Sequence, residues 1–319
     1  MSEHTATDEN ILQLGTVLGG RYQIIACLGI GGMGSVYLVA DKVLSNRQVA
    51  LKILHSDLVR DDSIKQRFLR EVQLMNAINH PNIARTYDVG TDGELLFFTM
   101  EYLEGQPLSD YVHSEQAVFS FIANVAMQIC AGLKAIHSIE VLHRDLKPDN
   151  IFVLSDGHIK ITDFGVAKHK TSDLTRQHEV VGSVHYMAPE VWRGQPLTPA
   201  VDYYSLGVIL YELATGQRPF TSEDTAQIMW LHVKRPPAPP RSIKNDIPVW
   251  LNQLILSLLE KNPSNRLKNP DEIISSIKSN SGVQPLGFAH TASGRYRAVT
   301  DPMVVATISS ETMPKYPPP

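Results

Sequence analysis

Residues 143–150 read HRDLKPDN, and the interpretation of the whole chain starts from this stretch. It places three charged or polar side chains, Asp145, Lys147 and Asn150, within six consecutive residues. Taken singly, each of these polar residues is better explained as part of a turn or a helix cap. The meaning of the stretch therefore depends on the residues that accompany it elsewhere in the sequence.

A glycine cluster lies upstream, where residues 29–36 read GIGGMGSV and fit the pattern G-x-G-x-x-G-x-V. The same glycine spacing marks dinucleotide-binding folds, but there the third glycine opens a helix, whereas here a strand-like run follows. The chain has no G-x-x-x-x-G-K-[ST] string, which excludes a Walker-type P-loop. A plain glycine-rich hairpin stays an alternative. The context favours a loop whose backbone approaches phosphates, because glycine carries no Cβ.

A lysine follows the cluster within the apolar run Val49-Ala50-Leu51-Lys52. A lone strand lysine is usually a solvated edge residue, but one in an apolar strand needs a partner. Glu71, on the predicted helix that follows, can supply the opposite charge. Breaking a buried pair of this kind costs roughly 3–5 kcal/mol. The paired ammonium can then hold the α- and β-phosphates of a nucleotide.

Further motifs follow in order: Asp163-Phe164-Gly165, Ala188-Pro189-Glu190, Asp202 before Gly207, and Arg266 after Asn262-Pro263. Together with residues 143–150 they resemble the eukaryotic-type protein kinases, from about Arg21 to Ile277. The stretch from Gly31 to Leu38 and the Pro-rich connector from Lys234 to Arg241 resemble the bacterial Ser/Thr branch. The resemblance implies an α+β bilobal fold, with a small β-rich lobe that has one main helix and a larger helical lobe.

The resemblance also implies roles for the polar residues. Asp145 would act as base or orienting group for the attacking hydroxyl, and Lys147 would neutralise the transferring phosphate. Asn150 and Asp163 would bind Mg²⁺, with Mn²⁺ as an alternative, because such ions prefer hard oxygen ligands. Lys147 followed by Pro148 resembles kinases that are specific for Ser and Thr. The expected activity is transfer of the γ-phosphoryl group of ATP to protein hydroxyls.

The ATP pocket follows from the same resemblance. The adenine is expected between Val36 and Ala50 above and Phe152 below, with Met100 as gatekeeper and the backbone of Glu101 and Leu103 as hinge. The full set of expected ATP-binding residues is Leu28, Gly29, Ile30, Gly31, Gly32, Met33, Gly34, Ser35, Val36, Ala50, Lys52, Met100, Glu101, Leu103 and Phe152. Glu190 and Arg266 match a buried structural ion pair.

Arg144 precedes the catalytic aspartate, which resembles kinases that are activated by phosphorylation, since arginine pairs bidentately with phosphate. Thr175 is the expected activating site and Thr171 the second. Ser183 stands where the family usually has threonine, and Thr86 where an apolar residue is expected.

The predicted organisation is an extension at residues 1–20, a kinase domain at 21–279 and a flexible polar tail at 280–319. The lobes divide into residues 21–103 and 104–279. Helices are expected at about 63–78, 119–137, 198–215, 248–259 and 271–279, and strands at 22–26, 35–40, 48–54 and 95–102.

Composition adds limits. The chain has 319 residues with a net charge of −4, which gives no indication of nucleic-acid binding. Cys27 and Cys130 lack metal-ligand spacing and are expected to be free thiols in a reducing compartment. The polar N-terminus does not resemble a signal peptide, and no apolar run reaches the ~18–20 residues of a membrane span. The expected location is the cytoplasm.

Expected partners are Ser- or Thr-containing protein substrates, a transient homodimer, and a phosphothreonine-reading protein at tail residues Thr300 and Thr307, although a plain solvated tail is the stronger interpretation. The connector at 234–241 could instead bind a polyproline-reading module. Two other functions compete with the protein kinase. A pseudokinase is disfavoured because Lys52, Glu71, Asp145, Asn150 and Asp163 are all present. A small-molecule kinase is disfavoured by Ala188-Pro189-Glu190.

Overall fold

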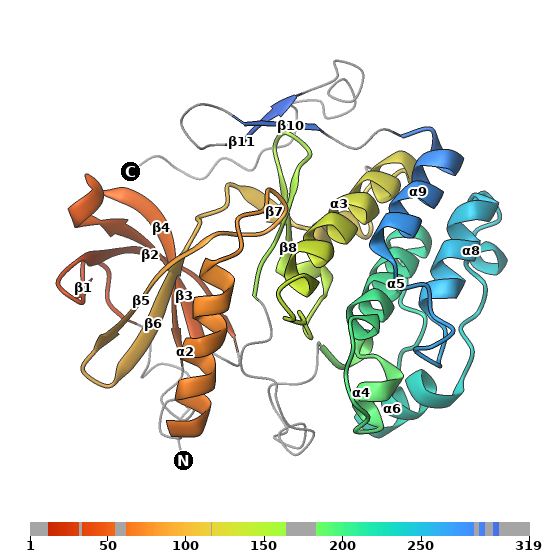
Figure 1. Ribbon diagram of the computed structural model, residues 1–319, viewed down its shortest axis with the longest axis horizontal. Helices are drawn as coiled ribbons and strands as arrows, with labels where there is room; N and C mark the ends of the chain where they lie inside the picture. Colours follow the sequence, from red (N-terminus) through yellow and green to blue (C-terminus); the bar gives the residue numbers. More distant parts are fainter. Residues whose placement is uncertain are drawn as a thin grey trace, which may run out of the picture.

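The computed structural model describes residues 12–31, 34–54, 62–115, 117–163, 183–283, 287–290 and 296–299. The described chain forms a sheet half and a helical half, joined by the segment after Met100 (Figure 1). This is the α+β bilobal arrangement that the sequence predicted.

The sheet half is built on six antiparallel strands in the order β1-β2-β3-β4-β6-β5. Their bounds are β1 Val17–Leu18, β2 Tyr22–Gly31, β3 Gly34–Asp41, β4 Arg47–Leu54, β5 Thr86–Asp92 and β6 Leu95–Met100, with a 3₁₀ turn η1 at Lys42–Leu44. Because β1 pairs with β2, the sheet begins inside the segment that was expected to be an extension.

The two faces of this sheet have different neighbours, because successive strand residues point to opposite faces. Tyr37, Val39, Val49 and Leu51 lie in one apolar cluster with Leu18 and Phe97 from the neighbouring strands. The opposite face receives α2, Asp62–Asn76, whose Phe68, Val72 and Met75 are buried in the second cluster together with Phe98. The predicted helical spacing of these α2 residues is confirmed, and Ile64 lies outside the described side chains.

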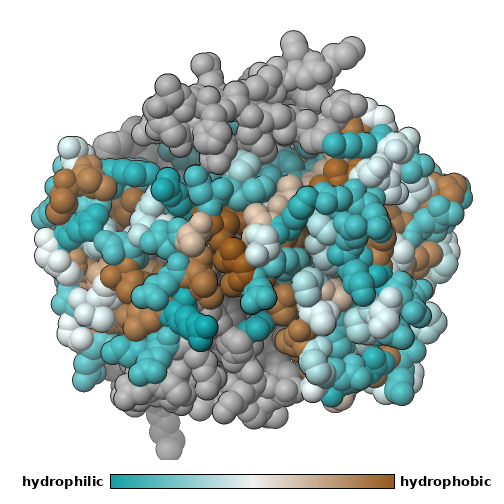
Figure 2. Space-filling view, viewed as in Figure 1, coloured by the Kyte–Doolittle hydropathy of each residue, from teal (hydrophilic) through white to brown (hydrophobic). Residues whose placement is uncertain are grey.

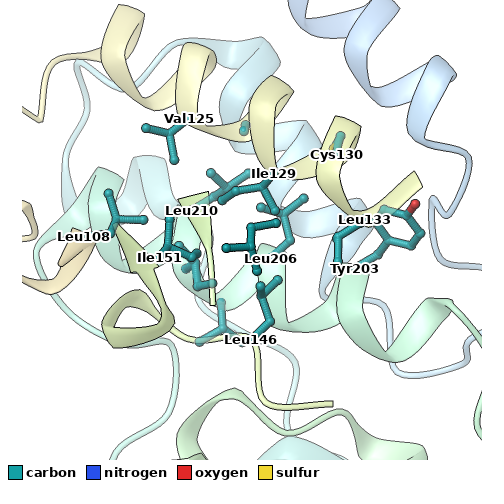
Figure 3. Close-up of a cluster of buried hydrophobic side chains, with 14 of the residues drawn as sticks. Leu108, Val125, Ile129, Cys130, Leu133, Leu146, Ile151, Tyr203, Leu206 and Leu210 are labelled. Atoms are coloured by element: carbon teal, nitrogen blue, oxygen red, sulfur yellow. The ribbon is translucent and has the colours of Figure 1, made fainter. Parts of the chain in front are cut away.

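The helical half contains α3 Phe119–His137, α4 Pro189–Trp192, α5 Ala200–Thr215, α6 Thr225–Lys234, α7 Pro240–Ile243, α8 Val249–Leu258 and α9 Pro270–Ser281. Every residue of α5 is buried, as expected for a helix that is apolar on all sides. Figure 3 shows the core between α3 and α5, where Ile129 and Leu133 meet Leu206 and Leu210. The predicted helices in this half are confirmed, and α6 was not predicted.

A small sheet of three strands lies where the two halves meet. Its order is β7-β8-β9, with β7 Gly105–Pro107, β8 Ile151–Leu154 and β9 Ile159–Ile161. Three 3₁₀ turns accompany it in the chain, η2 Leu108–Tyr111, η3 Pro148–Asn150 and η5 Ser183–Tyr186. The stretch 143–150 therefore leads directly into β8.

The tail contains two short strands that the sequence did not predict. β10 Gly287–His290 pairs antiparallel with β11 Tyr296–Val299, and the hairpin is drawn at the top of Figure 1. The Pro-rich connector lies between α6 and α7, with Arg235, Pro236 and Pro239 exposed.

Candidate active site

Strand register brings the predicted nucleotide-binding residues onto one face of the sheet. Gly29 lies opposite Val36, and Val36 lies opposite Lys52. In the next row Ala50 lies opposite Met100, which in turn lies opposite Thr86. Val36, Ala50, Lys52 and Met100 therefore share the face turned away from the cluster around Tyr37. Figure 2 shows apolar side chains gathered between the two halves of the molecule.

The last glycine of the cluster, Gly34, has no room for a side chain. Gly34 has a φ of +151°, and a Cβ at this position would come within 1.8 Å of the Ile53 carbonyl oxygen. Gly31 differs, because the nearest atom to a Cβ there would be 3.9 Å away. The close approach of β3 to β4 thus requires glycine at 34, independently of any ligand.

Lys52 reaches across the site to Asp163. Its Nζ lies 2.5 Å from Asp163 Oδ1, and the two side chains are 13% and 31% exposed. The sequence predicted Glu71 as the partner of Lys52, but the Glu71 side chain lies outside the described residues. The pair with Asp163 was not predicted, and it joins the nucleotide-facing sheet to the expected metal ligand.

Asp163 lies two residues after the end of β9 in a left-handed backbone conformation, with a φ of +52°. A non-glycine residue in this region carries strain of about 1–3 kcal/mol and persists only where its neighbours hold it. The preceding Thr162 provides such a hold, because its backbone N–H and its hydroxyl both donate to the Asn150 carbonyl oxygen. The two expected metal ligands, Asn150 and Asp163, are thereby held next to each other.

Asp202 of α5 anchors the loop that contains Asp145. Its buried carboxylate accepts hydrogen bonds from the backbone N–H groups of His143 and Arg144, both at 2.9 Å, and from His137 Nε2 at 2.8 Å. Arg144, like Asp163, has a left-handed φ, here +63°. Burial alone would raise the pKa of Asp202, but the hydrogen bonds and charge of His137 hold the pKa below its ordinary value.

The side chain of His143, at the start of this loop, is fully buried. Its Nδ1 accepts the Asp145 backbone N–H at 3.3 Å, and its Nε2 lies 2.9 Å from the Thr162 carbonyl oxygen. A carbonyl can only accept, so the proton must be on Nε2. Burial lowers the pKa of His143, which favours this neutral form. The ring therefore joins Asp145 to the residue before Asp163.

Asn150 contacts Asp145 directly. Its Nδ2 donates to the Asp145 carbonyl oxygen at 2.9 Å and to Asp145 Oδ2 at 3.3 Å. Since the amide nitrogen makes both bonds, Oδ1 is the Asn150 atom left for a cation. The hard oxygen atoms of Asn150 and Asp163 suit a small divalent cation such as Mg²⁺, although the described residues contain no cluster of three His, Cys, Asp or Glu side chains.

The remaining predicted residues have different outcomes. Leu28 and Ile30 are 47% and 57% exposed, Ser35 is buried, and Phe152 is half-buried on β8. The Glu101 side chain accepts from Lys160 at 2.8 Å and from the Arg85 N–H at 3.1 Å, so its carboxylate is held by structural contacts beside the expected hinge. Gly32, Met33, Thr171 and Thr175 lie outside the described residues.

Glu190 and Arg266 form the expected buried ion pair. The guanidinium donates to both carboxylate oxygens, at 2.6 and 3.0 Å, and also to the Ala200 and Glu260 carbonyls. Bidentate geometry with the remaining donors satisfied makes such burial tolerable. The pair ties α4 to the segment that precedes α9, away from the reacting residues.

From the sequence, Asp202 was named only as part of a motif. Neither the contacts of Asp202 nor the part that His137 plays in them was predicted. An aspartate within an otherwise apolar helix was the available signal, because a buried carboxylate needs donors.

A family comparison agrees with this geometry. Residues 22–277 match the family model described as the protein kinase domain. The chain belongs to the protein kinase family. Its curated relatives include a probable serine/threonine-protein kinase of Clostridium acetobutylicum, 39% identical over 84% of this chain, and PrkC of Bacillus subtilis, 36% identical over 83%. PknB of Mycobacterium tuberculosis is 37% identical over 80% of the chain. This is the bacterial Ser/Thr branch that the sequence resembled.

The match covers 41% of the length of the first two relatives and 42% of PknB, so the chain spans less than half of each. Among solved structures, the Mycobacterium tuberculosis PknI kinase domain has a TM-score of 0.68 at 24% identity, covering 85% of this chain and all of that one. This likeness confirms the protein kinase fold.

Among the described helices, α3 is long and apolar enough to cross a membrane by length and composition. Two thirds of its apolar window, 67%, is buried inside the structure, where it packs on α5. This burial is the pattern of a core helix.

Proposed function

We propose that the chain is a Ser/Thr protein kinase that transfers the γ-phosphoryl group of ATP to protein hydroxyls. The supporting observation is a series of contacts that joins the sheet face to the loop of residues 143–150. Lys52 binds Asp163, the adjoining Thr162 donates to the Asn150 carbonyl oxygen, and the Asn150 amide donates to Asp145. Phosphoryl transfer needs positioning and charge neutralisation more than covalent chemistry, and this set of groups supplies both.

Asp145 is assigned to the attacking hydroxyl, as base or orienting group. The Asn150 amide and the His143 ring fix its side chain and backbone. A positioned base of this kind contributes roughly 10²–10⁴-fold to a rate. Lys147 follows on the same loop and is half-buried, so its ammonium is assigned to the transferring phosphate.

ATP and a divalent cation are the proposed cofactors. Asn150 and Asp163 would hold Mg²⁺, or Mn²⁺ in its place, which would neutralise phosphate charge when bound. Lys52 would hold the α- and β-phosphates, since its ammonium is already within reach of Asp163. Val36, Ala50 and Phe152 would enclose the adenine beside Met100, and the backbone of Glu101 and Leu103 would bind its edge.

Incubation with γ-labelled ATP, Mg²⁺ and a generic protein substrate, followed by phosphoamino-acid analysis, tests the proposal. We expect label on serine and threonine. Absence of label from substrate and kinase alike, or label on tyrosine alone, would contradict it.

Phosphorylation of Thr175, and secondarily Thr171, is the proposed activation step, and Arg144 is the cation that would pair with the phosphate. Mass spectrometry after incubation with Mg·ATP should find phosphate on these residues. A fully active enzyme with both unmodified would exclude this switch.

Protein substrates, a transient homodimer and a phosphothreonine-reading partner at Thr300 or Thr307 complete the proposal, with the cytoplasm as the location. Pull-down with the phosphorylated tail, compared with the unphosphorylated tail, tests the last partner.

A further inference from the structure

A network of buried side-chain amides binds β9, the strand that precedes Asp163, and takes no part in the proposed mechanism. Its centre is Gln128, in the middle of α3, with Asn82 from the segment that links α2 to β5. Gln128 is 3% exposed and Asn82 is 1% exposed. Buried amides are costly unless their hydrogen bonds are satisfied, so what they bind is informative.

Gln128 bonds to the backbone on either side of His158, where the turn after β8 leads into β9. Its Oε1 accepts the Ile159 backbone N–H at 3.0 Å and Asn82 Nδ2 at 2.7 Å, while its Nε2 donates to the Gly157 carbonyl oxygen at 3.1 Å. One side chain thus fixes the start of the strand that ends next to Asp163.

Asn82 extends the same network to the far end of β9. Its Nδ2 donates to the Ile159 carbonyl oxygen at 3.1 Å, and its own carbonyl accepts the Ile161 N–H at 2.9 Å. Ala84 N–H then donates to the Ile161 carbonyl oxygen at 2.9 Å. Residues 82–84 therefore line the edge of β9 opposite β8, the strand that follows residues 143–150.

Helix α3 packs closely against β9, so a shift of the helix would also move the strand. A Cβ on Gly132, one turn after Gln128, would come within 2.7 Å of Ile161 Cδ1 and 3.4 Å of the Asn82 carbonyl oxygen. The backbone of α3 therefore packs directly against the Ile161 side chain and the Asn82 backbone. The strain at Asp163, with its φ of +52°, requires a support of this kind.

We propose that Gln128 is a positioning residue for Asp163, acting through the backbone of β9, and that it tunes the affinity of the site for the metal–nucleotide complex. This inference rests on the proposed role of Asp163 as a metal ligand. A one-ångström displacement of a ligand carboxylate is enough to weaken a metal site.

The test measures binding of a fluorescent, non-hydrolysable ATP analogue with Mg²⁺ and, separately, with EDTA. For Gln128→Met, of similar length but without hydrogen-bonding atoms, we expect the gain in affinity from Mg²⁺ to fall at least fivefold. Affinity in EDTA should change less than twofold, because the sheet face that binds the purine does not contact Gln128. Gln128→Asn, which keeps the amide but shortens its reach, should show the same selective loss and serves if Gln128→Met does not fold.

Asn124→Leu is the matched control. Asn124 lies one turn earlier on α3, is 8% exposed, and its Oδ1 has no hydrogen-bond partner among the described residues. It should leave the Mg²⁺-dependent gain unchanged. The inference would be overturned if the Gln128 variants lost the same factor of nucleotide affinity with Mg²⁺ and with EDTA, or if their gain in affinity from Mg²⁺ equalled that of the wild type. A wild-type protein that gains nothing from Mg²⁺ would overturn the proposed function as well.

Discussion

The catalytic loop, residues 143–150, and the glycine-rich loop, residues 28–36, contribute to the same site but are held in different ways. The catalytic loop is fixed by hydrogen bonds from the buried carboxylate of Asp202 on α5 and from two buried side chains of its own, His143 and Asn150. The glycine-rich loop carries exposed apolar side chains at Leu28 and Ile30. One region is organised by the protein itself, whereas the other leaves apolar surface for a ligand to cover.

This difference follows from what each loop would do. Groups that act on a developing charge are most effective when their positions are fixed before the reaction. A loop that covers a nucleotide must admit and release it, so its contacts must be weaker in the free protein. Loss of the buried contacts that hold the catalytic loop should therefore mainly lower stability, whereas loss of an exposed side chain of the glycine-rich loop should mainly weaken nucleotide binding.

Asp202→Ala is expected to have the largest effect on stability, about 3–5 kcal/mol. It removes the acceptor of two buried backbone N–H groups and of His137, which are then left unpaired. Urea unfolding followed by circular dichroism measures the change. Asp271→Ala is the control, because it breaks the exposed Lys134–Asp271 pair and should cost under about 1 kcal/mol. Equal losses of unfolding free energy in the two variants would show that the contacts of Asp202 do not stabilise the fold more than an exposed ion pair does.

Gly34→Ala should destabilise the fold by about 1–3 kcal/mol and weaken nucleotide binding. The new Cβ would collide with the Ile53 carbonyl oxygen and force β3 away from β4. Gly31→Ala, in the same loop but with 3.9 Å to the nearest atom, should change stability by less than about 0.5 kcal/mol. Thermal unfolding and calorimetric titration with ATP compare the two. Identical behaviour of both glycines would show that the approach of the strands is not the constraint.

The pH dependence of stability should carry the signature of His143. Because burial lowers its folded-state pKa, the unfolded chain binds a proton near pH 6.5 that the folded protein does not. Stability conferred by the neutral ring is present above this pH and is lost as the pH falls below it. His143→Phe should reduce the slope of unfolding free energy against pH below pH 6.5, by at most about 1.4 kcal/mol per pH unit, which is the limit for one proton. An unchanged slope would mean that His143 is not the titrating group.

Leu28→Ala is expected to have the smallest effect on stability, under about 0.5 kcal/mol, since its side chain is 47% exposed. Its loss should nevertheless raise the dissociation constant for ATP roughly fivefold, because about 1 kcal/mol of apolar contact with the purine disappears. Equilibrium binding of a fluorescent ATP analogue measures this. A stability loss without weaker binding would reverse the assignment of the loop.

Motifs predicted the parts of the molecule in which local sequence determines structure. The α3 bounds agree with the predicted helix at 119–137, and the glycine cluster does lie between two strands. The same stretches predicted roles for Asp145, Asn150 and Asp163, because the family's reacting groups occupy fixed places in short motifs.

Contacts between distant segments could not be predicted in this way. Lys52 pairs with Asp163, more than a hundred positions later in the chain, and Gln128 bonds to Asn82 and Ile159. Such pairs depend on how the two halves pack, which no local pattern encodes. The β10–β11 hairpin was missed because its two strands are only four residues each and show no clear alternation.

The most direct test compares phosphoryl transfer by the wild type and by Asp145→Asn, with ATP affinity and unfolding midpoint measured on the same samples. The account predicts that kcat falls by about 10²–10⁴ while affinity and midpoint stay close to wild type, because Asp145 acts on the hydroxyl and not on the nucleotide. Equal kcat in the two proteins would contradict it.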